Sequence, residues 1–192
     1  MLGILARYKT ISPENIDLII FCAKVLINSH LPECVLGGAE ILKNITNTSD
    51  DDIIIKAASG NIIPKLMQHM STYAYTNKQC LQVCSTLFAN YTSSNHVEVL
   101  EKILNNGILD RYLQLLQQDC PELIVIETLW SLSNIAADSE NLIEFLQAHN
   151  IMQSITEHSY STKPKVREEA LMIISNICFT GSPRQVLKLL YG

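Results

Sequence analysis

The stretch Glu127–Ser139, ETLWSLSNIAADS, holds the pattern that decides the fold, an apolar helix that ends in Asn-Ile. Three further segments end in the same way or in a close variant: AEILKNIT with Asn44, CSTLFANYT with Asn90 and MIISNICF with Asn176. Together with Asn134, these asparagines lie 46, 44 and 42 residues apart. Self-similarity at a period of about 20–50 residues is typical of proteins built from repeated supersecondary units.

A second marker keeps the same phase. A residue that tolerates a left-handed backbone, followed by an apolar pair, occurs at Asn61, Gly107 and Asn150. These positions follow the preceding Asn of the first pattern by 17, 17 and 16 residues. The same offset counted backwards falls on Asn15, so an incomplete first unit fits as well. Two markers in register predict a chain of equivalent units.

Each unit is predicted to contain three helices, of which the third and longest ends at the Asn motif. Short first helices are expected over 52–59, 96–105 and 140–149, and second helices over 62–70, 108–118 and 151–158. Apolar residues of the third helix recur at three- and four-residue steps, which gives one stripe for a core. The first two helices cannot bury their apolar faces alone, so neighbouring units must stack.

Proline positions agree with this division. Pro64 lies in the first turn of a second helix, Pro121 and Pro164 lie at the starts of third helices, and Ser182-Pro183 opens one more helix. We predict a single domain over residues 1–192. Its units are expected over 1–47, 51–92, 95–137 and 139–179, with a terminal helix over 182–192.

A unit of about 42 residues whose third helix ends in WSLSNIA resembles the armadillo repeat. The stretch Glu127–Ser139 is most similar to importin α, and Val166–Ile177, VREEALMIISNI, is similar to a late repeat of the same family. The resemblance implies an all-α, right-handed α solenoid of armadillo-like three-helix repeats, in a short and divergent form. It also implies an adaptor for nuclear protein import, in the cytoplasm, the nucleus or both, whose concave groove binds extended, Lys-rich segments.

In that family a Trp and the Asn one helical turn later line the groove, and Trp130 with Asn134 matches this pattern in full. An Asn amide offers a donor and an acceptor to the backbone of an extended ligand. An indole offers an apolar wall and a π face to a Lys side chain. Acidic residues one turn earlier would neutralise a bound cation. The predicted peptide-binding residues are Trp130, Asn134, Asn176, Asn90, Asn44, Glu127 and Glu169.

Each of these residues has an alternative interpretation. An Asn at a helix end also bonds the backbone of the turn that follows. Trp130 is alternatively a core residue, but Leu129 and Leu132 already occupy the core stripe about 100° away around the helix, which favours exposure of Trp130 in the groove. The two glutamates are alternatively solvated or paired locally. The positions four residues before the other asparagines hold Glu40, Thr86 and Met172, where the family has Trp. A basic amino-terminal segment of the kind that recruits the family's β partner is also missing. These departures keep a second function open, a non-catalytic scaffold subunit inside a large multiprotein assembly.

The composition limits the class of partner. Fourteen Lys and Arg against nineteen Asp and Glu give a formal net charge of −5, without the basic excess that nucleic-acid binding requires. The longest apolar run, Ile16–Ile27, is shorter than the ~20 residues that span a bilayer, and Met1–Thr10 lacks the pattern of a secretory signal. Both ends carry apolar residues, among them Leu2 and Leu187, where terminal solenoid units need polar outer faces. We therefore expect protein partners within a hetero-complex, no nucleic acid and no membrane.

No residue pattern predicts catalysis, a metal or a cofactor. The five His are scattered, and none lies at a spacing from Cys or Ser that suggests a nucleophile pair. Cys80 and Cys84 share a helix face, but metal sites usually need three or four ligands. Asp50–Asp52 lacks the Gly and distal Glu of a calcium loop and is interpreted as a helix start. The six cysteines lie in apolar helical patterns and are expected to be reduced core residues. The chain is not expected to be an enzyme.

Overall fold

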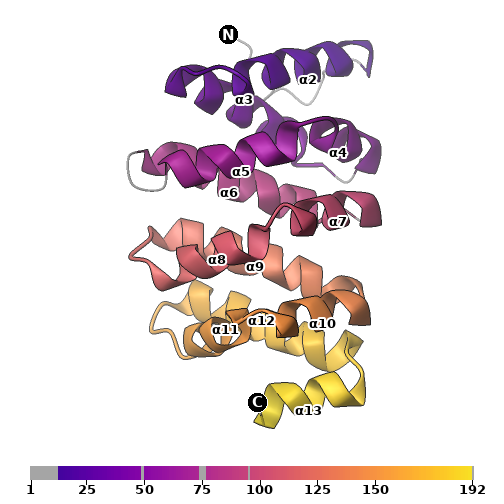
Figure 1. Cartoon of the computed structure of the whole chain (residues 1–192), viewed down its shortest axis with the longest axis vertical. Coiled ribbons are helices and arrows are strands. Elements are labelled where there is room, and N and C mark those ends of the chain that lie inside the picture. The colour runs from indigo at the N-terminus through magenta and orange to yellow at the C-terminus, as the bar shows by residue number, and fades with distance from the viewer. Residues whose placement is uncertain (1–12, 49, 74–76, 95, 192) are drawn as a thin grey trace. The chain divides into compact units, whose positions relative to one another are not determined.

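The computed structural model describes residues 13–48, 50–73, 77–94 and 96–191, and within these ranges it contains helices and no strand (Figure 1). The chain divides into two compact units, residues 1–106 and 107–192. The apolar residues predicted before residue 13, Leu2 among them, lie outside the described ranges. In the described part of the chain, no helix is long and apolar enough to cross a membrane.

The first unit consists of two layers of helices. Its helices are α2 (Pro13–Ile27), α3 (Pro32–Ile45), α4 (Asp51–Ala58), α5 (Ile62–Tyr73), α6 (Lys78–Thr92) and α7 (Val97–Asn105). The long helices α3 and α6 lie side by side, α2 packs on α3, and α5 packs on α6 (Figure 1). The core lies between these layers, where large side chains such as Leu66, Leu87 and Phe88 are fully buried.

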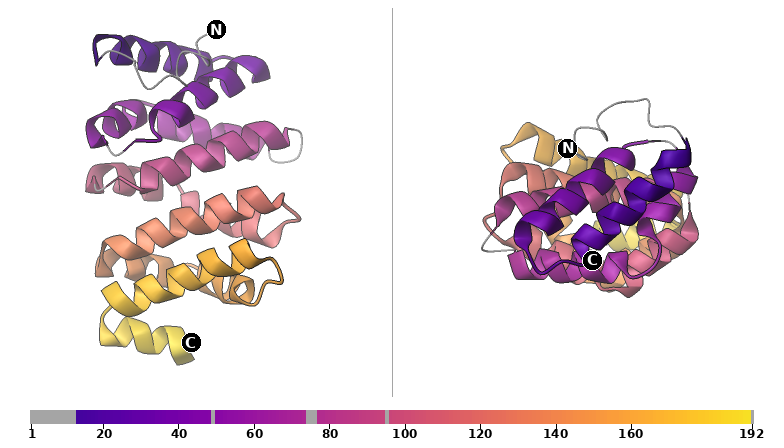
Figure 2. Two further views of the ribbon diagram at one scale, coloured as in Figure 1. Left: turned by 180° about the vertical axis from the view of Figure 1, so that it is seen from behind. Right: turned by 90° about the horizontal axis from the view of Figure 1, so that it is seen from above.

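The second unit repeats this arrangement. Its helices are α8 (Ile108–Gln117), α9 (Glu122–Asp138), α10 (Glu140–Ala148), α11 (Ile151–Ser159), α12 (Pro164–Thr180) and α13 (Pro183–Tyr191). The long helices α9 and α12 lie side by side, as the view from behind in Figure 2 shows, and α8 and α11 cover their other side. The short helices α10 and α13 pack at one end of this pair.

The helices lie close to those expected from the sequence, but the left-handed marker is wrong at two of its three positions. Gly107 has φ 80°, which is left-handed as expected. At the other two positions no left-handed residue occurs: the positive φ falls on Gly60 (71°), one residue before Asn61, and Asn150 has φ −70°. A side chain makes the left-handed backbone costly, so the neighbouring glycine takes it where one is present.

Three lysines cap the carboxyl ends of short helices, a feature that the sequence did not reveal. Lys24 donates to the Ser59 carbonyl oxygen at 3.2 Å and Lys102 donates to the carbonyl oxygens of Ala58 and Gly60, all at the end of α4. In the second unit, Lys188 donates to the carbonyl oxygen of Gln147 at the end of α10. A cation at the carboxyl end of a helix interacts favourably with the helix dipole and with carbonyls that have no partner in the helix.

The interpretation of the six cysteines as helical core residues holds for two of them, and Cys22 of α2 and Cys34 of α3 are only half-buried. Cys80 and Cys84 are buried in α6, as expected. Cys120 lies in the connection between α8 and α9, and Cys178 of α12 is exposed. Cys178 is exposed because its side of α12 is not covered by another helix of the second unit.

Two buried tyrosines differ in what their hydroxyl groups meet. Tyr91 of α6 and Tyr112 of α8 are both fully buried, and burial raises the pKa of both. The Tyr112 hydroxyl donates to Ser131 Oγ at 2.8 Å. The Tyr91 hydroxyl has no hydrogen-bond partner among the described residues. The two tyrosines are therefore a matched pair, in which the buried hydroxyl of Tyr112 has a hydrogen-bond partner and that of Tyr91 has none among the described residues.

We expect Tyr91→Phe to raise the free energy of unfolding by about 1 kcal/mol, because it removes a buried hydroxyl that has lost its bond to water. Tyr112→Phe should lower the same quantity by about 1 kcal/mol, because a satisfied hydrogen bond is removed. Urea unfolding of both variants against the parent chain measures the two changes. If both variants change the free energy of unfolding in the same direction, the two hydroxyl groups do not differ in hydrogen bonding as described.

Candidate functional site

Six of the residues on α9 and α12 form the candidate site. On α9, the side chains of Glu127, Trp130 and Asn134 follow one another at steps of three and four residues, which keeps them on one side of the helix. On α12, the residues 42 positions later are Glu169, Met172 and Asn176. Since α9 and α12 lie side by side, we call this set of six residues the α9–α12 face (Figure 2).

Trp130 lies at the surface. Its side chain is 38% exposed, whereas its neighbours Leu129 and Leu132 are fully buried in the core stripe of the same helix. Met172, at the equivalent position of α12, is 48% exposed. The predicted exposure of Trp130 is confirmed, and its contact with a peptide stays a prediction.

Asn176 joins the two helices of the face. Its side-chain amide donates to both the carbonyl oxygen and the Oγ of Ser133, each at 3.0 Å. Ser133 is the residue immediately before Asn134, so the bond connects equivalent turns of two consecutive third helices. Asn134 and Asn176 are both half-buried.

The same contact occurs in the first unit, where it is more deeply buried. Asn90 of α6 is only 5% exposed, and its amide donates to the Lys43 carbonyl oxygen at 3.0 Å and to Thr46 Oγ1 at 3.1 Å. Lys43 precedes Asn44, as Ser133 precedes Asn134. The repeated Asn is thus a clamp between adjacent third helices, a role that neither sequence interpretation contained. The periodicity of the Asn motif could have indicated this role, because a hydrogen bond between equivalent positions of successive repeats requires the same residue in each repeat.

In the first unit, no Trp precedes the repeated asparagines, and most of the side chains at the equivalent positions form contacts within the chain. Glu40 pairs with Lys43, three residues on, with 3.9 Å between the charged atoms. Thr86 donates to the carbonyl oxygen of Gln82, and Asn90 is buried. Asn44 is half-buried, and its side chain has no hydrogen bond among the described residues. We therefore restrict the candidate site to the second unit.

The charge on the α9–α12 face is negative. Burial raises the pKa of Glu169, and the nearby carboxylate of Glu168 raises it further. Lys165 pairs with Glu168 at 2.7 Å, so the nearest cation is directed to the other carboxylate. Glu127 is half-buried, and its charge contributes to the raised pKa of Tyr112 after burial itself. Glu127, one turn before Trp130 on α9, and Glu169, at the equivalent position on α12, give the face two partly buried carboxylates, which favour a cationic ligand.

Within the ranges that the structure describes, no group of three or more His, Cys, Asp or Glu could hold a metal ion. Cys80 and Cys84 of α6 are free thiols that share a hydrogen bond, and this hydrogen bond together with burial raises the pKa of the Cys84 thiol. The side chain of Asp50 accepts a hydrogen bond from the Asp52 backbone at 3.1 Å, which confirms its role as a helix cap.

Comparison with solved structures decides the fold. A designed armadillo repeat protein in complex with the peptide (KR)4 aligns with 98% of this chain and 77% of its own chain, with a TM-score of 0.84 at 21% sequence identity. Computationally designed armadillo repeat proteins for modular peptide recognition align over 98% and 77%, with a TM-score of 0.85 at 18% identity. The chain has the armadillo-repeat fold. No model of a known protein family matches it.

The armadillo repeat accounts for the helix order. Within the first unit, α4, α5 and α6 follow one another in the order short, intermediate and long, and within the second unit the short helices α10 and α11 are followed by the long α12, which is the order of the three helices of one repeat. The predicted all-α armadillo fold is therefore confirmed, whereas the similarity to importin α stays a prediction. The α9–α12 face belongs to the third helices of two consecutive armadillo repeats.

Proposed function

We propose that this protein binds an extended, Lys- or Arg-rich protein segment along the α9–α12 face. The observation that carries the proposal is the exposed indole of Trp130 between Glu127 and Asn134, in a helix whose other large apolar residues are mostly buried. A Lys or Arg side chain packs its apolar stem on an indole and its charge on the π face. The armadillo protein in complex with the peptide (KR)4 supports the same class of ligand.

The spacing of the repeats fits an extended ligand. Adjacent packed helices lie about 8–10 Å apart, and an extended chain rises about 3.3 Å per residue. Equivalent positions on α9 and α12 therefore lie opposite residues about three apart in the bound segment. Met172 replaces a second Trp, so the indole of Trp130 provides most of the binding to a cation.

The proposed ligand also suggests a cellular role in nuclear protein import. A basic, extended segment is the kind of cargo signal that an importin-α-like adaptor carries in nuclear protein import, which would place this protein in the cytoplasm, the nucleus or both. The proposal rests on the similarity of Glu127–Ser139 to that family. It assigns the chain a binding role and no catalytic one.

A fluorescein-labelled (KR)4 peptide titrated with the protein tests the binding proposal. We expect Trp130→Ala to weaken the affinity at least tenfold, because the cation–π and stem contacts are lost. Phe145→Ala is the matched control, since Phe145 is an aromatic residue of α10, 36% exposed and outside the face. The parent affinity should fall as salt rises, because exposed charges are screened. Equal binding by Trp130→Ala and the parent would contradict the proposal.

A second candidate function is that of a non-catalytic scaffold subunit. The observation that favours it is a stripe on α2 of the first unit, where Leu18, Phe21 and Val25 are 61%, 64% and 55% exposed. Contiguous exposed apolar residues mark interaction surfaces. If (KR)4 does not bind at millimolar concentration, the importin-like version fails and the scaffold function remains.

A further inference from the structure

Helices α9 and α12 of the second unit lie side by side in register. Near their amino ends, Lys163 Nζ lies 3.8 Å from Glu122 Oε2. Near their carboxyl ends, the Thr180 hydroxyl donates to the Ala137 carbonyl oxygen at 3.4 Å. The Asn clamp described above lies between these two contacts. Equivalent positions of the two helices are therefore neighbours along the whole α9–α12 face.

The two apolar side chains of the face are neighbours as well, but they differ in chemistry. Trp130 is 38% exposed, and Met172, at the equivalent position of α12, is 48% exposed. The indole stays exposed although α12 packs on α9, so exposure at this position of a third helix does not depend on what covers the next side of that helix. The thioether of Met172 is apolar and adaptable, but it has no π face for a cation.

The charges of the two helices differ in the same direction. Helix α9 carries three acidic residues and no Lys or Arg. On α12, Lys165 and Arg167 offset the two glutamates, and Lys163 directly precedes the first turn. A cationic side chain is therefore attracted to α9, whereas α12 has no net negative charge to attract a second one.

We propose that the segment bound along the α9–α12 face is basic over α9 and apolar over α12, and that Met172 is the residue that determines this specificity. The inference rests on the proposed function and specifies its ligand further. The Lys or Arg of the segment packs on the indole of Trp130, and a side chain of the size of Leu or Met is buried against the Met172 thioether. A second cation placed there would lose water without gaining a π face or a net negative charge.

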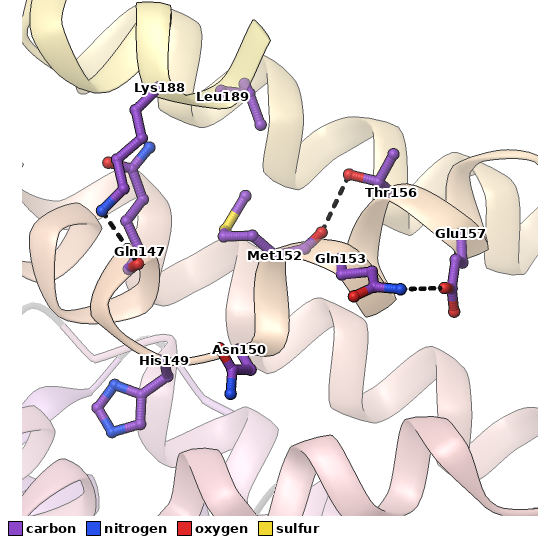
Figure 3. Close-up of a pocket in the computed structure, with 9 residues that line it drawn as sticks. All are labelled: Gln147, His149, Asn150, Met152, Gln153, Thr156, Glu157, Lys188 and Leu189. Carbon is purple, nitrogen blue, oxygen red and sulfur yellow. Dashed lines mark hydrogen bonds between the residues drawn. The ribbon is translucent and has the colours of Figure 1, made fainter. Parts of the chain in front are cut away.

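The second unit offers a different place for an apolar side chain, a cleft of about 520 Å³ between α11 and α13. Figure 3 shows the side chains of Met152 and Leu189 projecting into it from these two helices. None of the residues that line the cleft belongs to the α9–α12 face. Substitution of Met152, which is half-buried, therefore distinguishes the cleft from the position beside Met172.

Two pairs of fluorescein-labelled peptides measure what the apolar part contributes. The first pair is KRKRSLSL and KRKRSSSS, and the second pair, LSLSKRKR and SSSSKRKR, presents the same residues in the opposite chain direction. The formal charge is identical within a pair, so charge does not account for a difference. In one of the two pairs, the parent chain should bind the leucine peptide at least about fivefold more tightly, because partly buried leucine side chains leave water.

Two variants of the protein locate this gain. Met172→Ser should reduce the gain to about twofold or less, because the apolar contact is lost, and it should leave the affinity for the serine peptide unchanged. Met152→Ser is the matched control and should retain the gain. Trp130→Ala should weaken both peptides of the pair, because they share the basic half.

Equal binding within both pairs would overturn the inference, and so would a leucine gain that survives Met172→Ser. A gain that is lost in Met152→Ser and kept in Met172→Ser would place the leucines in the cleft. In each of these cases the proposed function stands if Trp130→Ala weakens the serine peptides. If neither serine peptide binds in a way that depends on Trp130, the proposed function fails and the inference fails with it.

Discussion

Gly38→Ala is expected to lower the free energy of unfolding by about 1–3 kcal/mol, although alanine is the better helix former. Gly38 lies in α3 and faces α2. A Cβ added there would lie 2.6 Å from the Ala23 carbonyl oxygen and 2.9 Å from side-chain atoms of Leu26 and Ile27. The carbonyl belongs to the backbone of α2, so the two helices would have to move apart.

Gly37→Ala, one residue earlier in the same helix, is the matched control. A Cβ added at Gly37 meets nothing within 4 Å. The same chemical change should there raise the free energy of unfolding by about 1 kcal/mol, because glycine is the poorer residue inside a helix. Urea unfolding of the two variants should therefore give opposite signs. Stabilisation by both would show that α2 and α3 are not packed this closely.

Asn90→Ala is expected to lower the free energy of unfolding by about 2–3 kcal/mol. Asn90 is buried and donates to the Lys43 carbonyl oxygen and to Thr46 Oγ1, at the end of α3. The variant leaves these buried acceptors without their donor, and each unsatisfied buried group costs about 1–3 kcal/mol. The substitution therefore weakens the packing of α6 against α3.

Asn44→Ala is the control for this clamp. Asn44 occupies the equivalent position of α3, but its side chain is half-buried and makes no hydrogen bond among the described residues. We expect a change below about 0.5 kcal/mol, as for other substitutions at positions without special contacts. Thermal or urea unfolding measures both. If the two variants lose the same stability, the Asn of this repeat acts through its own helix and not as a clamp between helices.

The Asn clamp changes what the asparagines of the α9–α12 face can offer to a bound segment. An amide that donates to the neighbouring helix offers its oxygen to a ligand and no longer both of its hydrogens. In the second unit, Asn176 is half-buried, so its carbonyl remains a potential acceptor for the backbone N–H of a bound segment. Recognition along the α9–α12 face then depends more on Trp130 and on the carboxylates than on the asparagines.

The sequence by itself determined the secondary structure and the repeat. Two markers at a common spacing located the first and second helices of the repeats, which are α4, α5, α7, α8, α10 and α11, to within three residues at each end. This was possible because apolar periodicity, proline and glycine are local signals. Trp130 could be assigned to the surface for the same reason, since Leu129 and Leu132 already define the buried side of its helix. These inferences needed only positions along one helix.

The tertiary structure alone decided what each repeated residue does. The Asn motif marked four equivalent positions, but only packing shows that Asn90 is buried against α3 while Asn176 is half-buried and Asn44 has no bond among the described residues. Likewise, Leu129 and Leu171 look alike in sequence, yet one is covered and the other is exposed. Burial is a property of what lies on the next helix, and a repeat that specifies each helix in the same way cannot contain that information.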